Sequence, residues 1–361
     1  MTAAGGLLFG PGTGRRMVLT QAALAAVIGL RIALGPYAGL AGQPPSLFRP
    51  VSFLRFLDAM PSAAVIVGLQ LAGTLAAALA VAGRRRRATF PVAWVCLLVL
   101  AGLRSSRGKF LHNDALLLLA AVPFLLAPAL RWRDRAAVAP SGRFGWPVRA
   151  ATIVVAGAYF FSGWAKLRHS GLGWVTTDNM RYVLYEAAGG ARVAFPAIPR
   201  WLAGQAWLTH GLATSALLLE VTFPVVLLML GRSGGRARPL VGAVYAGAAA
   251  AFHAGTWLVL GLDYWAWAAV VAVVLVDWCP LVERMSRYGL GRHAGDRAGA
   301  GNQAGPADVV PAERGPRQRW PTGRMREKAE DRTCDNAAAA GPGPSGSDAL
   351  VSLRSPPSPP S

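Results

Sequence analysis

Apolar residues gather in long runs along most of this chain, and short polar stretches separate the runs. A helix needs about 20 mostly apolar residues to cross the hydrocarbon core of a bilayer. The pattern predicts an all-α, polytopic transmembrane bundle, in which abundant Gly and Ala allow close helix packing. The eight predicted spans are roughly 17–35, 61–83, 88–104, 112–130, 148–165, 207–230, 239–260 and 262–279.

Composition divides the chain into three parts. Residues 1–16 form a short N-terminal segment, and residues 17–280 hold the predicted spans. Residues 281–361 are basic, rich in Gly, Pro and Ser, and end in SLRSPPSPPS. Such a segment buries too little apolar surface to offset the loss of chain entropy, so we expect a disordered tail. No internal repeat is visible in the sequence.

Charge is scarce and unevenly placed. Charged residues make up 15% of the chain, against about 25% in soluble domains. The net charge is +20, and most arginines lie beside apolar runs or in the tail. That placement favours contact with anionic lipid headgroups over binding of nucleic acid.

The positive-inside rule gives an orientation. If the spans alternate in direction, the arginines near residues 15–16, 84–87, 131–135, 232–238 and 284–292 share one side. That side is then cytoplasmic. We expect a plasma-membrane protein with both termini in the cytoplasm. Arg104, Arg107 and Lys109 contradict the pattern, because they fall on the outer side.

Two predicted outer loops are long. Residues 36–60 mix aromatic, aliphatic and charged positions, which suggests an amphipathic helix at the interface. In residues 166–206, Trp174 and Trp201 fit an aromatic belt, and Asp178 to Ala188 is expected to form a surface or re-entrant helix.

Glu220 is the clearest candidate functional residue within a span. An ionised carboxylate at mid-membrane costs about 3 kcal/mol. A cation, a hydrogen bond or protonation must therefore compensate for it. Pro224 follows four residues later and deprives the Glu220 carbonyl of its usual helical donor.

Lys166 and His253 each allow two interpretations. Lys166 ends the fifth span, where a lysine either extends to the headgroups or sits in a dry pocket as a competent base. His169 is three residues away and can share its helix face. His253 is either a core residue with satisfied hydrogen bonds or a third member of a site with Lys166 and Glu220.

His112, Asn113 and Asp114 open the predicted fourth span. They either cap the helix or form a partly buried polar site. Arg31 is expected to extend to the headgroups and Asp263 to lie at the interface. The histidines are scattered, the three cysteines lack ligand spacing, and no P-loop or HExxH motif occurs, so no metal site is predicted.

Three stretches resemble the horizontally transferred transmembrane (HTTM) domain, the membrane part of vitamin K-dependent gamma-carboxylase. They are HNDALLLLAAVPFLLAP, YFFSGWAKL, and LEVTFPVVLLML followed by FHAGTWLVLGL. The resemblance covers roughly residues 17–280. Lys166 matches the carboxylase lysine that is implicated in deprotonating vitamin K hydroquinone.

The resemblance implies a quinone-handling or carboxylase-like membrane enzyme with an extracytoplasmic site. Lys166, supported by His253 and Glu220, would be catalytic, and residues 112–114 would bind an isoprenoid quinone. Two departures count against carboxylation of protein glutamates. Ala165 replaces the neighbouring lysine of the carboxylase stretch, and a polar tail replaces its large lumenal domain.

Two non-enzymatic functions remain open. The chain is alternatively a membrane factor for maturation or export of, or immunity to, a secreted peptide, in which case its outer loops bind that partner. A transporter is the third hypothesis, since Glu220 and Pro224 share one span, but transporters of many families show repeats that this sequence lacks.

Overall fold

The computed structural model describes residues 3–107, 112–134, 137–190, 192–230 and 237–286. These residues are helical or irregular, with one isolated bridge between Gly12 and Ser141. The α-helices are α1 Ala3–Leu8, α2 Gly14–Leu34, α3 Ala63–Val81, α4 Arg86–Ser105, α5 Ala115–Leu125, α6 Gly142–Ser170, α7 Gly173–Thr176, α8 Asn179–Gly189, α9 Ala197–Ala203, α10 Ala206–Thr222, α11 Ala237–Leu260 and α12 Trp265–Leu275. The 3₁₀ helices are η1 Ala38–Gly42, η2 Pro45–Leu47, η3 Ser52–Leu54 and η5 Phe223–Leu230.

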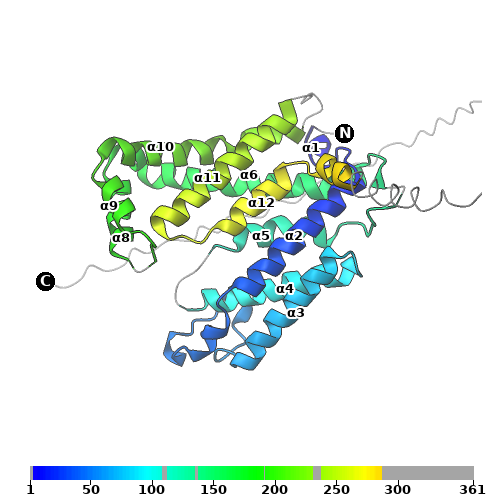
Figure 1. Ribbon diagram of the computed structural model, residues 1–361, viewed down its shortest axis with the longest axis horizontal. Helices are drawn as coiled ribbons and strands as arrows, with labels where there is room; N and C mark the ends of the chain where they lie inside the picture. The colour runs from blue at the N-terminus through cyan, green and yellow to red at the C-terminus, as the bar shows by residue number, and fades with distance from the viewer. Residues whose placement is uncertain (1–2, 108–111, 135–136, 191, 231–236, 287–361) are drawn as a thin grey trace, which may run out of the picture. The chain divides into compact units, whose positions relative to one another are not determined.

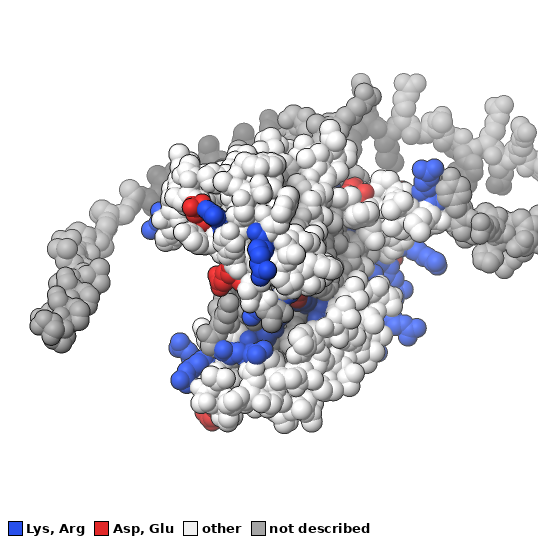
Figure 2. Space-filling view, turned by 60° about the vertical axis from the view of Figure 1, so that its left-hand side comes forward, with Lys and Arg blue, Asp and Glu red and all other residues white. Residues whose placement is uncertain are grey.

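Long apolar helices make the chain a multi-pass membrane protein. Six helices in the described ranges are long and apolar enough to span a bilayer, namely α2, α3, α4, α6, α10 with η5, and α11. Many of their outward side chains are large and apolar, as at Leu71 and Leu75 of α3. Continuous exposed apolar faces of this kind are what contact with lipid requires. Figure 2 shows a mostly uncharged face, with charged atoms in separate groups.

The predicted count of eight spans is not confirmed. In place of the fourth span, 112–130, the helix α5 has 11 residues and a length of about 16 Å. Leu117, Ala120 and Phe124 of α5 are fully or almost fully buried. Hydropathy alone does not separate a short helix inside the bundle from a lipid-facing span, because both are apolar.

The last predicted span, 262–279, is also interrupted. Helix α12 ends at Leu275, and the helical segment Cys279–Ser286 continues at an angle of 78°. Pro280 lies just after this break, and proline lacks the amide hydrogen that a continuing helix needs. If this bent pair counts as one span, the described residues hold up to seven spans.

The helices pack in two neighbouring groups. Helix α2 packs against α3 and α4, while α6 packs against α10, η5 and α5 (Figure 1). Helix α12 lies against α11 and also contacts α2, α5 and α6, so it connects the two groups. The contacts of α12 with α2 and α5 bring polar residues from distant parts of the sequence together.

Several arginine-bearing segments meet at one end of the bundle, as the charge pattern predicts. Arg15 pairs with Glu283 at 2.7 Å, and Arg149 Nη1 donates to the Leu7 and Leu230 carbonyls at 2.8 Å. Arg85 and Arg131 line one hollow at this end. Which compartment this end faces stays a prediction. The predicted disordered tail lies outside the described residues, apart from its first few positions.

One of the two long loops does not form its predicted helix. Residues 36–60 contain the three short 3₁₀ helices η1, η2 and η3, so the predicted amphipathic helix is wrong. Pro44, Pro45 and Pro50 lie in this segment and prevent a continuous α-helix, because each removes a backbone donor. In the second loop the predicted helix is confirmed, since α8 occupies most of 178–188.

Candidate functional site

Lys166 and Glu220 meet between α6 and α10. Gly163 of α6 makes this approach possible, because a Cβ there would lie 2.9 Å from both Glu220 Cβ and Val221 Cγ2. A contact that short forces neighbouring atoms to move. The small residue therefore sets the spacing at which the two charged side chains reach each other.

Three polar side chains form this group. Lys166 Nζ lies 2.6 Å and 2.5 Å from the two Glu220 carboxylate oxygens. Ser162 donates to Glu220 Oε1 at 3.0 Å and accepts from Lys166 Nζ at 3.1 Å. The Lys166 side chain is 21% exposed and that of Glu220 only 6%. The expectation that a cation or hydrogen bond compensates Glu220 is confirmed.

The immediate surroundings are aromatic and the backbone is locally tightened. Lys166 Nζ lies 5.4 Å from the centroid of a Trp174 ring, where a cation–π attraction applies. Helix α10 gives way to η5 at Phe223, whose amide donates to the Glu220 carbonyl. The 3₁₀ turn thus supplies the donor that Pro224 withholds.

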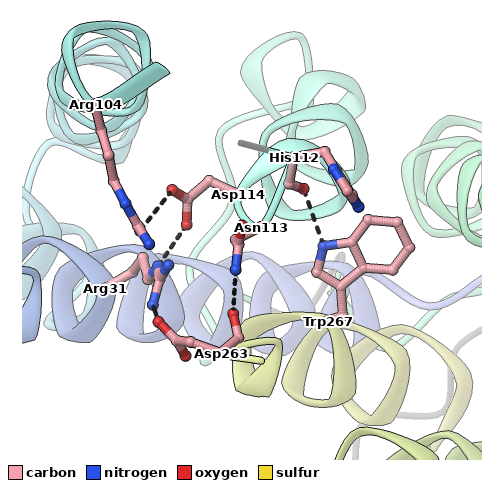
Figure 3. A network of polar contacts seen from close by, with 7 residues as sticks. All are labelled: Arg31, Arg104, His112, Asn113, Asp114, Asp263 and Trp267. Carbon is pink, nitrogen blue, oxygen red and sulfur yellow. Dashed lines mark hydrogen bonds and ion pairs between the residues drawn. The ribbon is translucent and has the colours of Figure 1, made fainter. Parts of the chain in front are cut away.

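A second polar group joins α2, α4, the start of α5 and the α11–α12 turn. Arg31 lies between two carboxylates, with Nε 2.5 Å from Asp114 Oδ1 and Nη1 2.5 Å from Asp263 Oδ2 (Figure 3). Arg104 Nη1 approaches Asp114 Oδ2 at 3.8 Å from another side. Two cations and two carboxylates therefore balance each other.

The structure overturns the expectation for Arg31 and decides between the alternatives left open for Asp114 and Arg104. The Arg31 side chain is 4% exposed and ion-paired, so it does not extend to the headgroups. Asp114 occupies the N-cap position of α5 but makes no capping hydrogen bond, since its carboxylate serves the arginines. Arg104, which departs from the predicted charge pattern, faces Asp114. Lys109 lies outside the described residues.

His112 and Asn113 bind the start of α12. Asn113 Nδ2 donates to the Asp263 carbonyl at 2.6 Å, and the Tyr264 hydroxyl lies 2.6 Å from His112 Nε2. Trp267 Nε1 donates to the His112 carbonyl at 3.3 Å. Desolvation lowers the pKa of His112 and raises that of Tyr264, so both groups are neutral at pH 7.

His253 lies in an aromatic cluster that sequence reasoning missed. Its Nε2 is 2.7 Å from the Tyr159 hydroxyl, and its ring contacts Tyr264 and Trp267 at centroid distances of 5.7 and 6.0 Å. Tyr159 in turn stacks on Phe223 at 4.0 Å. Among the described residues, His253 Nδ1 has no hydrogen-bond partner although it is buried.

Two cavities lie along α11. One of about 370 Å³ is lined by His253, Asp263, Trp257 and Trp265. A second, of about 350 Å³, lies between α8, α10 and α11 and is almost wholly apolar. Both volumes fall within the range of small-molecule sites.

The structure thus brings the six candidates into two groups rather than one. Lys166 and Glu220 form a pair, while Tyr264 and Trp267 connect His253 to His112. Asn113 contacts the adjacent Asp263 directly, and Asp114 does so through Arg31. No hydrogen bond or ion pair joins His253 to Lys166 or Glu220 within the described residues. The helical spacing of Tyr159, Ser162 and Lys166 at i, i+3 and i+7 is the sequence signal that predicts a polar stripe on α6. His169 is exposed and takes no part in the Lys166 pair.

Comparison with known proteins adds no family. No family model, curated protein or solved structure matches the chain. Within the described ranges, no group of three or more His, Cys, Asp or Glu side chains is arranged to hold a metal ion. The two polar groups and the cavities are therefore the features that bear on function.

Proposed function

We propose that this chain is a membrane-embedded acid–base enzyme of HTTM type that acts on an isoprenoid hydroquinone. The observation that carries the proposal is the contact of Lys166 with Glu220 and Ser162 at the end of a membrane helix. A lysine that is partly exposed while its carboxylate partner is buried can reach a substrate and exchange a proton with that partner.

The proton step needs no other residue. Transfer of one proton from Lys166 Nζ to the Glu220 carboxylate, over 2.5 Å, gives a neutral amine and a carboxylic acid. A low dielectric favours such a neutral pair relative to the same step in water, because it disfavours separate charges. The amine then accepts the hydroxyl proton of the hydroquinone and leaves an anion that oxidants attack more readily.

Substrate entry would use the cavities near α11. Their apolar and aromatic walls suit a lipid-dissolved ring and its isoprenoid chain. His253 lines the 370 Å³ cavity and has an unpartnered nitrogen among the described residues, which supplies a polar contact for a ring oxygen. Residues 112–114 would hold the adjoining wall through Asp263 and Tyr264.

Hydroquinone oxidation in nanodiscs tests this function. Dissolved dioxygen takes two electrons from the hydroquinone and becomes hydrogen peroxide, and absorbance follows the quinone formed. We expect Lys166→Ala to reduce any protein-dependent rate by about 100-fold or more. The control Arg168→Ala removes an exposed cation from the same helical turn. If the protein shows no rate above lipid alone, or if both variants retain the full rate, the function is wrong.

A second candidate is a non-catalytic membrane factor that acts on a secreted peptide. Exposed aromatic side chains on and between α8, α9 and α10 favour it, namely Tyr182, Tyr185, Phe195, Trp201 and Trp207. In this case Lys166 and Glu220 only fasten α6 to α10. Photo-crosslinking from Trp201 in native membranes would recover a peptide or protein, and recovery of lipid alone would contradict this candidate.

A further inference from the structure

A basic hollow lies at the end of the bundle where α3 ends, α4 begins and α5 ends. Its volume is about 480 Å³. The apolar part of its lining includes Pro91, Phe124 and Leu130. The cationic part of its lining consists of Arg85, Arg86, Arg87 and Arg131.

The cations of this hollow are not neutralised by the protein. Asp134 is the single carboxylate in its lining, and its Oδ2 accepts from the Arg131 backbone amide at 2.7 Å. Within the described ranges, no carboxylate lies within ion-pair distance of the four arginines. Four positive charges surround one carboxylate, which is already hydrogen-bonded to a backbone amide. Such an excess of positive charge attracts an anion from outside the chain.

One of these arginines is held in place by a side-chain hydrogen bond, and the backbone turn positions its neighbours. Arg86 Nε donates to the Ala80 carbonyl at the end of α3, at 2.9 Å. Arg85 adopts a left-handed backbone conformation with φ 47°, which is uncommon for a residue with a side chain. This tight turn between α3 and α4 directs three consecutive arginines to one place. A cation fixed as Arg86 is loses less conformational entropy when it binds an anion.

A second hollow of about 490 Å³ adjoins the first. The two share Arg87, Leu125, Ala127 and Pro128, and the second adds Arg143 and Trp146 from the first turns of α6. Arg87 therefore stands on the common wall of two cationic hollows. Two phosphate groups connected by a short bridge would each find an arginine there, with Arg87 available to both.

The position of these hollows identifies the source of the phosphates. They lie at the ends of membrane helices, the level at which phospholipid headgroups and interfacial tryptophans are found. The apolar residues in their linings suit the upper part of acyl chains, whereas a soluble phosphate compound gains nothing from them. We propose that the two hollows bind a phospholipid that carries two phosphate groups, as cardiolipin does. This site is independent of the proposed enzymatic function.

Native mass spectrometry of the full chain in detergent tests the site. Cardiolipin, phosphatidylglycerol with one phosphate, and inorganic diphosphate are titrated in parallel. We expect cardiolipin to bind at least about tenfold more tightly than phosphatidylglycerol, since one more charge-assisted contact forms. Arg87→Gln is expected to abolish most of this preference. Arg133→Gln is the control, because Arg133 is an exposed cation on the α5–α6 connection, two residues from Arg131, and lines neither hollow.

Three results would overturn the proposal. Equal affinity for the two lipids removes the role of the second phosphate. Equal effects of Arg87→Gln and Arg133→Gln mean that only overall charge matters. Displacement of the lipid by an equal concentration of diphosphate means that the ligand is a soluble phosphate compound. Arg87 is exposed and makes no hydrogen bond that the structure records, so the variant is expected to fold normally.

Discussion

Replacing Arg31 by methionine removes the cation that two carboxylates share. Asp114 is 4% exposed, so its charge would lose its closest partner inside the protein, whereas Asp263 is 42% exposed and can turn to water. Breaking a buried pair from one side costs about 3–5 kcal/mol, and an exposed pair is worth about 1 kcal/mol or less. Arg104 remains 3.8 Å from Asp114 and keeps the loss near the lower figure. We therefore expect a loss of about 3 kcal/mol.

Thermal unfolding in detergent measures this loss through a buried thiol. Cys96 is 6% exposed and becomes reactive toward a fluorogenic maleimide only on unfolding. Cys279 and Cys334 are first changed to serine, so that Cys96 is the single reporter. A loss of about 3 kcal/mol corresponds to a midpoint lower by about 6–12 °C. The exposed arginine Arg55 provides the control Arg55→Met, which should shift the midpoint by about 2 °C or less.

A second variant separates the lost ion pair from lost packing. Arg31→Met combined with Asp114→Leu removes both buried charges, and replacement of a buried pair by apolar residues is often neutral. The double variant should therefore recover most of the stability that Arg31→Met loses. If Arg31→Met unfolds within about 1 °C of the parent, or if the double variant is no more stable than the single one, the ion pair does not hold this part of the bundle together.

Two further predictions concern packing and pH. Gly163→Ala should separate α6 from α10 and lower the free energy of unfolding by about 1–3 kcal/mol. The control Gly157→Ala on the same helix meets no atom closer than 3.7 Å and should be neutral or stabilising. The same thiol assay compares the two variants, and equal midpoints would contradict the close contact. Burial lowers the pKa of His112 below 6.5, so as the pH falls the unfolded chain takes up a proton at this histidine before the folded chain does. The stability that neutral His112 contributes is therefore complete above pH 6.5 and is lost as pH falls through the folded-state pKa. The midpoint difference between about pH 7.5 and about pH 5 should shrink in His112→Gln, and an unchanged difference would show that His112 does not carry it.

The apolar pattern determined the membrane-spanning helices because that signal is local. A helix in lipid must satisfy its own backbone and face hydrocarbon, so each run of apolar residues specifies its structure without information from the rest of the chain. The runs that became α2, α3 and α11 illustrate this. The need of Glu220 for a partner was also predictable, because the cost of an isolated carboxylate depends only on its depth.

Only the tertiary structure decided which residues satisfy one another. Arg31, Asp114 and Asp263 are separated by 83 and 232 positions along the chain, and only the packing of α2 beside α5 and α12 brings them together. The same packing buries one face of the short helix α5, which hydropathy alone made a full span. Local apolar pattern determines where a chain enters the membrane, whereas the pairing of buried charges depends on how the helices align with one another, because those energies act only at a few ångströms.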